Sequence, residues 1–235
     1  MLLPVPACLA MTCPMNYRHG MRATAMAGHF LLASLPLLGL LTLLALLFSG
    51  EADLLWAFRL HKDAHPLLRE TMHIVSDWGN PVFYIAFLAL LILGRRSGNR
   101  RQVRFVVAYI VAQLLICLLL VTLTKMALGR PRPEAFTLLH HMLTLDPYFH
   151  SLPSGHTAEI TGSCLALALW FGRARLSLLL GLGIACMGLS RMYLFQHYPS
   201  DVLFGWMFGS VSGFAAYAFS TIKNDPDHHA PHSHG

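Results

Sequence analysis

Long apolar runs, separated by short polar stretches, make up most of this chain of 235 residues. A helix that crosses a bilayer needs about 20 apolar residues, and six runs reach or approach that length. They lie near 29–49, 80–94, 103–124, 157–172, 175–193 and 201–222. The pattern predicts an all-α, polytopic membrane protein with about six transmembrane helices.

The stretches between and around these runs suggest a single membrane domain with two short ends. We expect residues 1–27 to form a leader, 28–223 the six-helix domain and 224–235 a histidine-rich tail that is disordered rather than metal-binding. Residues 50–79 fit either an interfacial helix or an ordinary amphipathic connector. The loop 134–152 is apolar for a loop, so we expect it to lie on the membrane or to cover a lipid pocket.

Composition supports a membrane location. Only 12% of the residues are charged and 55% are hydrophobic, whereas soluble domains carry about 25% charged residues. The net charge of +6 comes from arginines and lysines that lie between apolar runs. That placement indicates membrane orientation rather than nucleic-acid binding.

The distribution of basic residues predicts which way the chain faces. One connection holds Arg95, Arg96, Arg100, Arg101 and Arg104 without an acid, and the basic residues of 173–175 fall on the same side of a six-span layout. The opposite connections mix both signs. By the positive-inside rule, both termini are cytoplasmic and the chain lies in an inner membrane, with its active site at the periplasmic face.

Three polar clusters stand out because charged groups beside hydrocarbon are costly and mark function. The first contains Lys125 and Arg132, at the exit of the third run; Arg191 comes from another part of the chain. Arginine's planar fork meets two phosphate oxygens at once, so these cations suit a phosphate. For Arg130, between them, we favour simple snorkelling to the lipid headgroups.

The second cluster is Pro153-Ser154-Gly155-His156, directly before the fourth run. A helix N-terminus presents free N–H groups to a phosphate. Gly155 permits close backbone approach, Ser154 adds a hydroxyl, and His156 is placed to transfer a proton. Glu159 follows three residues later; we expect it to cap the start of that helix, and the alternative is that it lines the entrance of the site.

The third cluster is Ser190-Arg191, followed by His197 and Asp201. Pro199 favours a helix start, so His197 should lie just before the sixth run and Asp201 in its first turn. The carboxylate can then accept a proton from one imidazole nitrogen and leave the other free for attack. A capping aspartate beside a surface histidine is the competing interpretation.

Together the three clusters resemble the signature of the type 2 phosphatidic acid phosphatase family, over roughly residues 80–222. The resemblance implies His197 as a nucleophile that forms a phosphohistidine, Asp201 as its orienting carboxylate and His156 as general acid and then base. It implies phosphate contacts from Lys125, Arg132, Ser154, Gly155 and Arg191. It implies no metal and no cofactor.

The sequence leaves the substrate and the acceptor open. A membrane lipid phosphate is the expected partner: undecaprenyl diphosphate, phosphatidic acid, phosphatidylglycerophosphate or lipid A. A phosphotransferase that passes phosphate from undecaprenyl diphosphate to another lipid is the alternative, and a non-catalytic membrane protein is less favoured. The oligomeric state cannot be read.

Three glycines in the last apolar run, Gly205, Gly209 and Gly213, repeat every four residues, which predicts close helix packing.

Overall fold

The computed structural model describes residues 21–135, 138 and 140–221, and every regular element among them is a helix. The elements are, in order, α1 Ala23–Leu47, α2 Glu51–Ala64, α3 Pro66–Arg96, α4 Arg100–Ala112, the π-helix η2 Gln113–Leu120, α5 Val121–Leu128, the short 3₁₀ helices η3 Pro133–Ala135 and η4 Pro147–Phe149, α6 Gly155–Phe171, α7 Ala174–Tyr193 and α8 Pro199–Thr221. The prediction of an all-α polytopic protein is confirmed. The predicted leader up to residue 20 and the histidine-rich tail lie outside the described residues.

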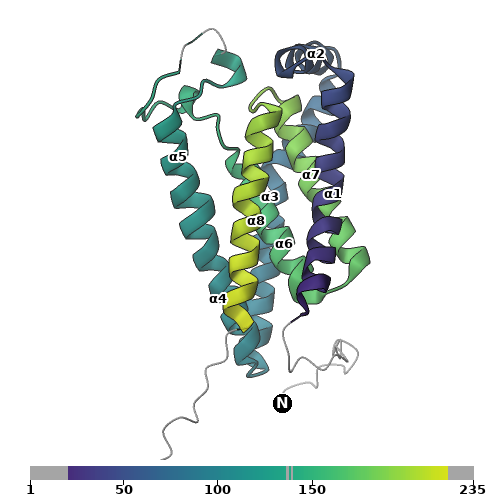
Figure 1. Ribbon diagram of the computed structural model, residues 1–235, viewed down its shortest axis with the longest axis vertical. Coiled ribbons are helices and arrows are strands. Elements are labelled where there is room, and N and C mark those ends of the chain that lie inside the picture. The colour runs from purple at the N-terminus through teal and green to yellow at the C-terminus, as the bar shows by residue number, and fades with distance from the viewer. Residues whose placement is uncertain (1–20, 136–137, 139, 222–235) are drawn as a thin grey trace, which may run out of the picture.

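Five helical stretches in the described part of the chain are long and apolar enough to cross a membrane: Ala23–Leu47, Pro66–Arg96, Arg100–Ala135, Ala174–Tyr193 and Pro199–Thr221. The fourth predicted run became α6, which has 17 residues. Twelve of them are buried inside the bundle, because α6 runs through its centre and the other helices surround it (Figure 1).

Residues 50–79, which were expected to contain an interfacial helix or to form a connector, contain the separate helix α2 at Glu51–Ala64. The rest belongs to α3, which begins at Pro66 and continues through the predicted second run to Arg96. Proline suits the first turn of a helix because its missing N–H has no partner there in any case.

The glycines of α8 allow it to pack directly on α6. A Cβ added at Gly209 would lie 2.3 Å from the Ala158 carbonyl oxygen, and one at Gly205 would lie 2.5 Å from that of Ser154. The predicted close packing is therefore confirmed. It brings the first turn of α8 beside the first turn of α6.

One end of the bundle brings together the helix ends that carry the polar clusters. The C-terminal ends of α5 and α7 and the N-terminal ends of α6 and α8 lie there together, and α2 turns away from the bundle axis at the same end (Figure 1). The turn between α3 and α4, which is flanked by the arginines at the ends of these two helices, lies at the opposite end. All three polar clusters therefore share one end, as a common site requires.

Candidate functional site

His197 and Asp201 form the centre of the site. His197 lies in the five-residue connection between α7 and α8, and Asp201 lies in the first turn of α8. Both side chains are almost completely buried, and His197 Nδ1 is 3.5 Å from Asp201 Oδ2. Burial lowers the pKa of His197 to about 4 although Asp201 opposes the shift. The imidazole is therefore neutral at pH 7, the form that a nucleophile needs.

The Asp201 carboxylate is held by several donors before any ligand arrives. Its Oδ2 accepts from the Ser151 hydroxyl at 2.5 Å and from the Tyr198 N–H at 2.9 Å. The Asp201 carbonyl accepts from the Ser154 N–H at 2.9 Å. Asp201 thus joins the second and third clusters and is far more than a surface cap.

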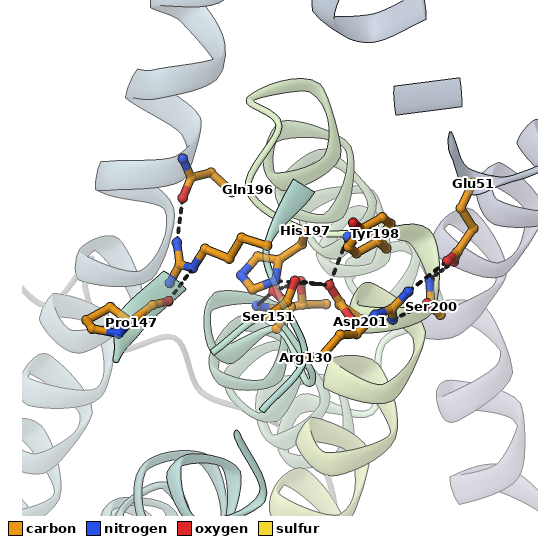
Figure 2. Close-up of polar contacts among 12 residues, drawn as sticks. Glu51, Arg130, Pro147, Ser151, Gln196, His197, Tyr198, Ser200 and Asp201 are labelled. Atoms are coloured by element: carbon orange, nitrogen blue, oxygen red, sulfur yellow. Dashed lines mark hydrogen bonds and ion pairs between the residues drawn. The ribbon is translucent and has the colours of Figure 1, made fainter. Parts of the chain in front are cut away.

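Arg130 completes the setting of Asp201, so the snorkelling interpretation of Arg130 is wrong. Its Nη1 donates to Asp201 Oδ1 at 2.7 Å, and its Nη2 lies 3.0 Å from Glu51 Oε2. Glu51, at the start of α2, also accepts from the Ser200 N–H at 2.6 Å. Figure 2 shows this chain of contacts from Glu51 through Arg130 to Asp201 and His197.

Three cations predicted as phosphate ligands surround the site from separate segments. Lys125 in α5 is close enough to Arg132 and Arg191 for their charges to interact. A Cβ built on Gly155 would lie 3.4 Å from Lys125 Nζ, so α5 also approaches the start of α6. Like charges gathered in this way favour an anion between them.

The two arginines are oriented by partners that the sequence did not identify. Arg191 is 8% exposed; its Nη1 donates to Ser76 Oγ at 2.5 Å, while its buried Nε has no hydrogen-bond partner. Arg132 donates to Gln196 Oε1 at 2.6 Å and to the Pro147 carbonyl at 3.1 Å (Figure 2).

The Pro153–His156 segment forms the predicted helix start, because α6 begins at Gly155. Ser154 is fully buried and is the N-cap: its Oγ accepts from the Thr157 hydroxyl at 3.0 Å and, at 3.5 Å, from the Thr157 N–H. His156 is exposed.

Glu159 was expected to cap α6, and that expectation is wrong because Ser154 has that role. Its side chain reaches α3 instead, where it accepts from the Tyr84 hydroxyl and, at 2.8 Å, from Asn80 Nδ2. Nothing in the sequence spacing indicates this contact, since about 75 residues separate the partners.

A cavity of about 490 Å³ opens beside the site. Lys125, Gly155 and His156 line one part of it. Most of the remaining wall comes from apolar residues of the consecutive helices α4, η2 and α5. Within the described residues, no three His, Cys, Asp or Glu side chains lie close enough together to hold a metal ion.

Comparisons with known proteins agree with the motifs. Residues 101–225 match the model of the PAP2 superfamily. The lipid A 1-phosphatase of Rhizobium etli is 34% identical over 161 residues, which cover 60% of this chain and 67% of the relative. That of Rhizobium johnstonii is 34% identical over 129 residues, or 52% of this chain and half of the relative.

A third relative is less similar in sequence. The undecaprenyl-diphosphatase of Sulfolobus acidocaldarius is 27% identical over 148 residues, which cover 63% of this chain and 68% of the relative. No solved structure matches the chain. Since the family model covers more than half of the sequence and three polar clusters converge as its signature requires, the chain belongs to the PAP2 superfamily and is a membrane phosphatase of that type.

Proposed function

We propose that this protein hydrolyses the phosphate monoester or diphosphate of a membrane lipid through a phosphohistidine on His197, without a metal ion. The observation that supports this most is the buried, neutral His197 beside Asp201, with Lys125 and Arg191 nearby. A neutral imidazole close to several cations can attack a phosphorus atom whose anionic oxygens those cations bind.

In the first step, His197 Nε2 attacks phosphorus while Nδ1 faces Asp201. The new N–P bond forms as the P–O bond to the lipid breaks, and His156 gives a proton to the departing oxygen. Burial and the nearby cations lower the pKa of His156 to about 4, so in this scheme His156 carries that proton only when the anionic phosphate is bound. Asp201 stabilises the positive charge that develops on the imidazole of His197. Its fixed position, held by Arg130 and Ser151, reduces the reorganisation that this step requires.

In the second step, His156 is neutral and accepts a proton from water. The resulting hydroxide attacks the phosphohistidine, the N–P bond breaks, and inorganic phosphate leaves with His197 and His156 restored. Both steps place extra negative charge on the phosphoryl oxygens. Lys125, Arg132 and Arg191 offset that charge, together with the Gly155 N–H at the start of α6 and the Ser154 hydroxyl.

A lipid substrate follows from the surroundings of the site. The neighbouring cavity is mainly apolar, and the helices that enclose it are apolar enough to lie in a membrane. Two relatives carry lipid names, lipid A 1-phosphatase and undecaprenyl-diphosphatase. We propose that the substrate belongs to this range of membrane lipid phosphates and that the site faces the periplasm.

The experiment is phosphate release by the detergent-purified protein from lipid A, undecaprenyl diphosphate and phosphatidic acid, each with and without EDTA. We expect release that survives EDTA and is abolished by His197→Ala. Loss of activity in EDTA would contradict metal independence, and full activity of His197→Ala would contradict the nucleophile. Label transferred from a donor lipid to an acceptor lipid, with no free phosphate, would instead support a phosphotransferase.

The orientation needs a separate test. Cysteines introduced at Gly98, in the turn between α3 and α4, and at His140, in the loop between α5 and α6, lie at opposite ends of the bundle. In intact cells, a membrane-impermeant thiol reagent should label the cysteine at 140 and leave that at 98 unlabelled. The reverse result would place the site in the cytoplasm.

A further inference from the structure

The cavity beside the site is lined both by residues of the proposed phosphate site and by apolar residues farther along the chain. Lys125, Gly155 and His156 line it at the site, and Ile110, Leu114 and Leu118 line it farther along α4 and η2. A volume of about 490 Å³ lies within the usual range of small-molecule pockets, about 300–1,000 Å³. The cavity is therefore large enough to hold the part of the substrate next to the phosphate.

One wall of this apolar cavity carries a carboxylate. Glu159 lines the cavity and lies three residues after His156 in α6, which corresponds to a rise of about 4.5 Å along the helix. Among the described residues, no Lys, Arg or His lies within ion-pair distance of Glu159. An ionisable residue at such a position is costly and marks function more often than structure.

The two known contacts of Glu159 do not use its full capacity. It accepts one hydrogen bond from the Tyr84 hydroxyl and one from Asn80 Nδ2, whereas a carboxylate offers about four acceptor sites. Tyr84 lines the same cavity, so this group of polar atoms faces the bound molecule. The unused acceptor sites match a hydrogen-bond donor on the ligand.

The helix opposite Glu159 is unusual as well. Residues 113–120 form a π-helix, and Gln113, Leu114 and Leu118 of this segment line the cavity. Such segments often occur at functional sites, because the wider turn shifts side chains out of the regular helical register.

We propose that Glu159 accepts a hydrogen bond from a hydroxyl or amide N–H of the substrate, within a few bonds of the phosphate. The inference rests on the proposed function and narrows its substrate class. The enzyme selects lipids whose phosphate is attached to a backbone with such a donor, as in acylated sugars or acylglycerols. It disfavours lipids whose phosphate is attached to bare hydrocarbon, as in polyprenyl phosphates.

The test uses two synthetic monophosphates with the same acyl chain: 1-acylglycerol 3-phosphate and its 2-deoxy analogue, which lacks only the free hydroxyl. A polyprenyl diphosphate is the third probe. The key variant is Glu159→Gln. Asn80 Oδ1 is buried without a hydrogen-bond partner. If the Asn80 amide rotates by half a turn, this oxygen can accept from the new Gln side chain, so that α3 and α6 stay connected by a hydrogen bond. Glu70→Gln, an exposed change on α3, is the matched control.

We expect the intact enzyme to have a higher kcat/KM for the hydroxyl probe than for its deoxy analogue. A hydrogen bond to a charged group is worth about tenfold to a hundredfold in such a ratio. In Glu159→Gln the ratio of the two kcat/KM values should fall towards one, mainly because kcat/KM for the hydroxyl probe decreases. In Glu70→Gln the ratio should stay as in the intact enzyme. A purely structural role of Glu159 would lower both rates together and leave the ratio unchanged.

Three outcomes would overturn the inference. They are a ratio near one in the intact enzyme, an unchanged ratio in Glu159→Gln, and hydrolysis of the polyprenyl diphosphate with neither acylglycerol probe accepted. In the third case the proposed function stands. Failure to release phosphate from any of the three lipids would contradict the proposed function itself.

Discussion

Arg130 and Asp201 form an ion pair of 2.7 Å in which the aspartate is completely buried. The arginine continues to Glu51 at 3.0 Å, so the contact connects the start of α2 with the carboxylate beside His197 (Figure 2). Removing one partner of a buried pair leaves the other charge uncompensated. Arg130 is therefore a positioning residue that acts through Asp201.

Replacing Arg130 tests that role. We expect Arg130→Gln to lower kcat by about tenfold to a hundredfold, because the carboxylate loses its fixed orientation, with a smaller change in KM. Arg130→Lys should recover part of the loss. Arg95→Gln, which changes an exposed arginine in the last turn of α3, is the control. The measurement is steady-state phosphate release after circular dichroism has confirmed folding; wild-type kcat in Arg130→Gln would refute the role.

Arg191 and its partner Ser76 give a graded prediction. Arg191→Gln removes a cation from the proposed phosphate site and should lower kcat/KM by about a hundredfold or more. Ser76→Ala removes only the hydroxyl that accepts from Arg191 Nη1, so the loss should be about tenfold. The measurement is kcat/KM of the two variants for the same lipid phosphate. Equal losses would mean that Arg191 acts mainly as a structural residue.

The neutral, buried His197 predicts a dependence of stability on pH. Its folded pKa of about 4 lies below the ordinary value of 6.5. The unfolded chain therefore binds more protons than the folded one between these values. The stabilising contribution is fully present above pH 6.5 and is lost as the pH falls towards 4.

The measurement is the unfolding temperature of the wild type and of His197→Asn at several pH values between 7.5 and about 4. We expect the difference, wild type minus variant, to stay constant above pH 6.5 and to decrease as the solution becomes more acidic. Parallel curves for the two proteins over the whole range would show that His197 does not titrate in this way.

The contact between α8 and α6 makes a prediction about stability alone. In Gly209→Ala the new methyl group would lie 2.3 Å from the Ala158 carbonyl oxygen, so the helices must separate. We expect a loss of about 1–3 kcal/mol and a lower unfolding temperature. Gly183→Ala in α7 is the matched control, since nothing lies within 4 Å of its added Cβ. Replacing glycine by alanine within a helix stabilises it by about 0.5–1 kcal/mol, so the unfolding temperature of Gly183→Ala should not fall.

The class of the protein and the chemical groups of its site could be predicted from the chain. Long apolar runs can satisfy their backbone in lipid only as helices, and the spacing of polar residues within such runs is visible without a structure. For that reason the helical fold and the glycine packing of α8 could be predicted. The family was identified from the three clusters that include Lys125, His156 and His197.

The residues that support those groups could be identified only from the packing of the helices. Arg130 with Glu51, Arg191 with Ser76, and Glu159 with Tyr84 are 79, 115 and 75 positions apart. Such contacts depend on how α2 and α3 pack against the other helices. Periodicity along the chain reports which face of a helix is apolar, but it carries no information about which distant side chain will meet that face.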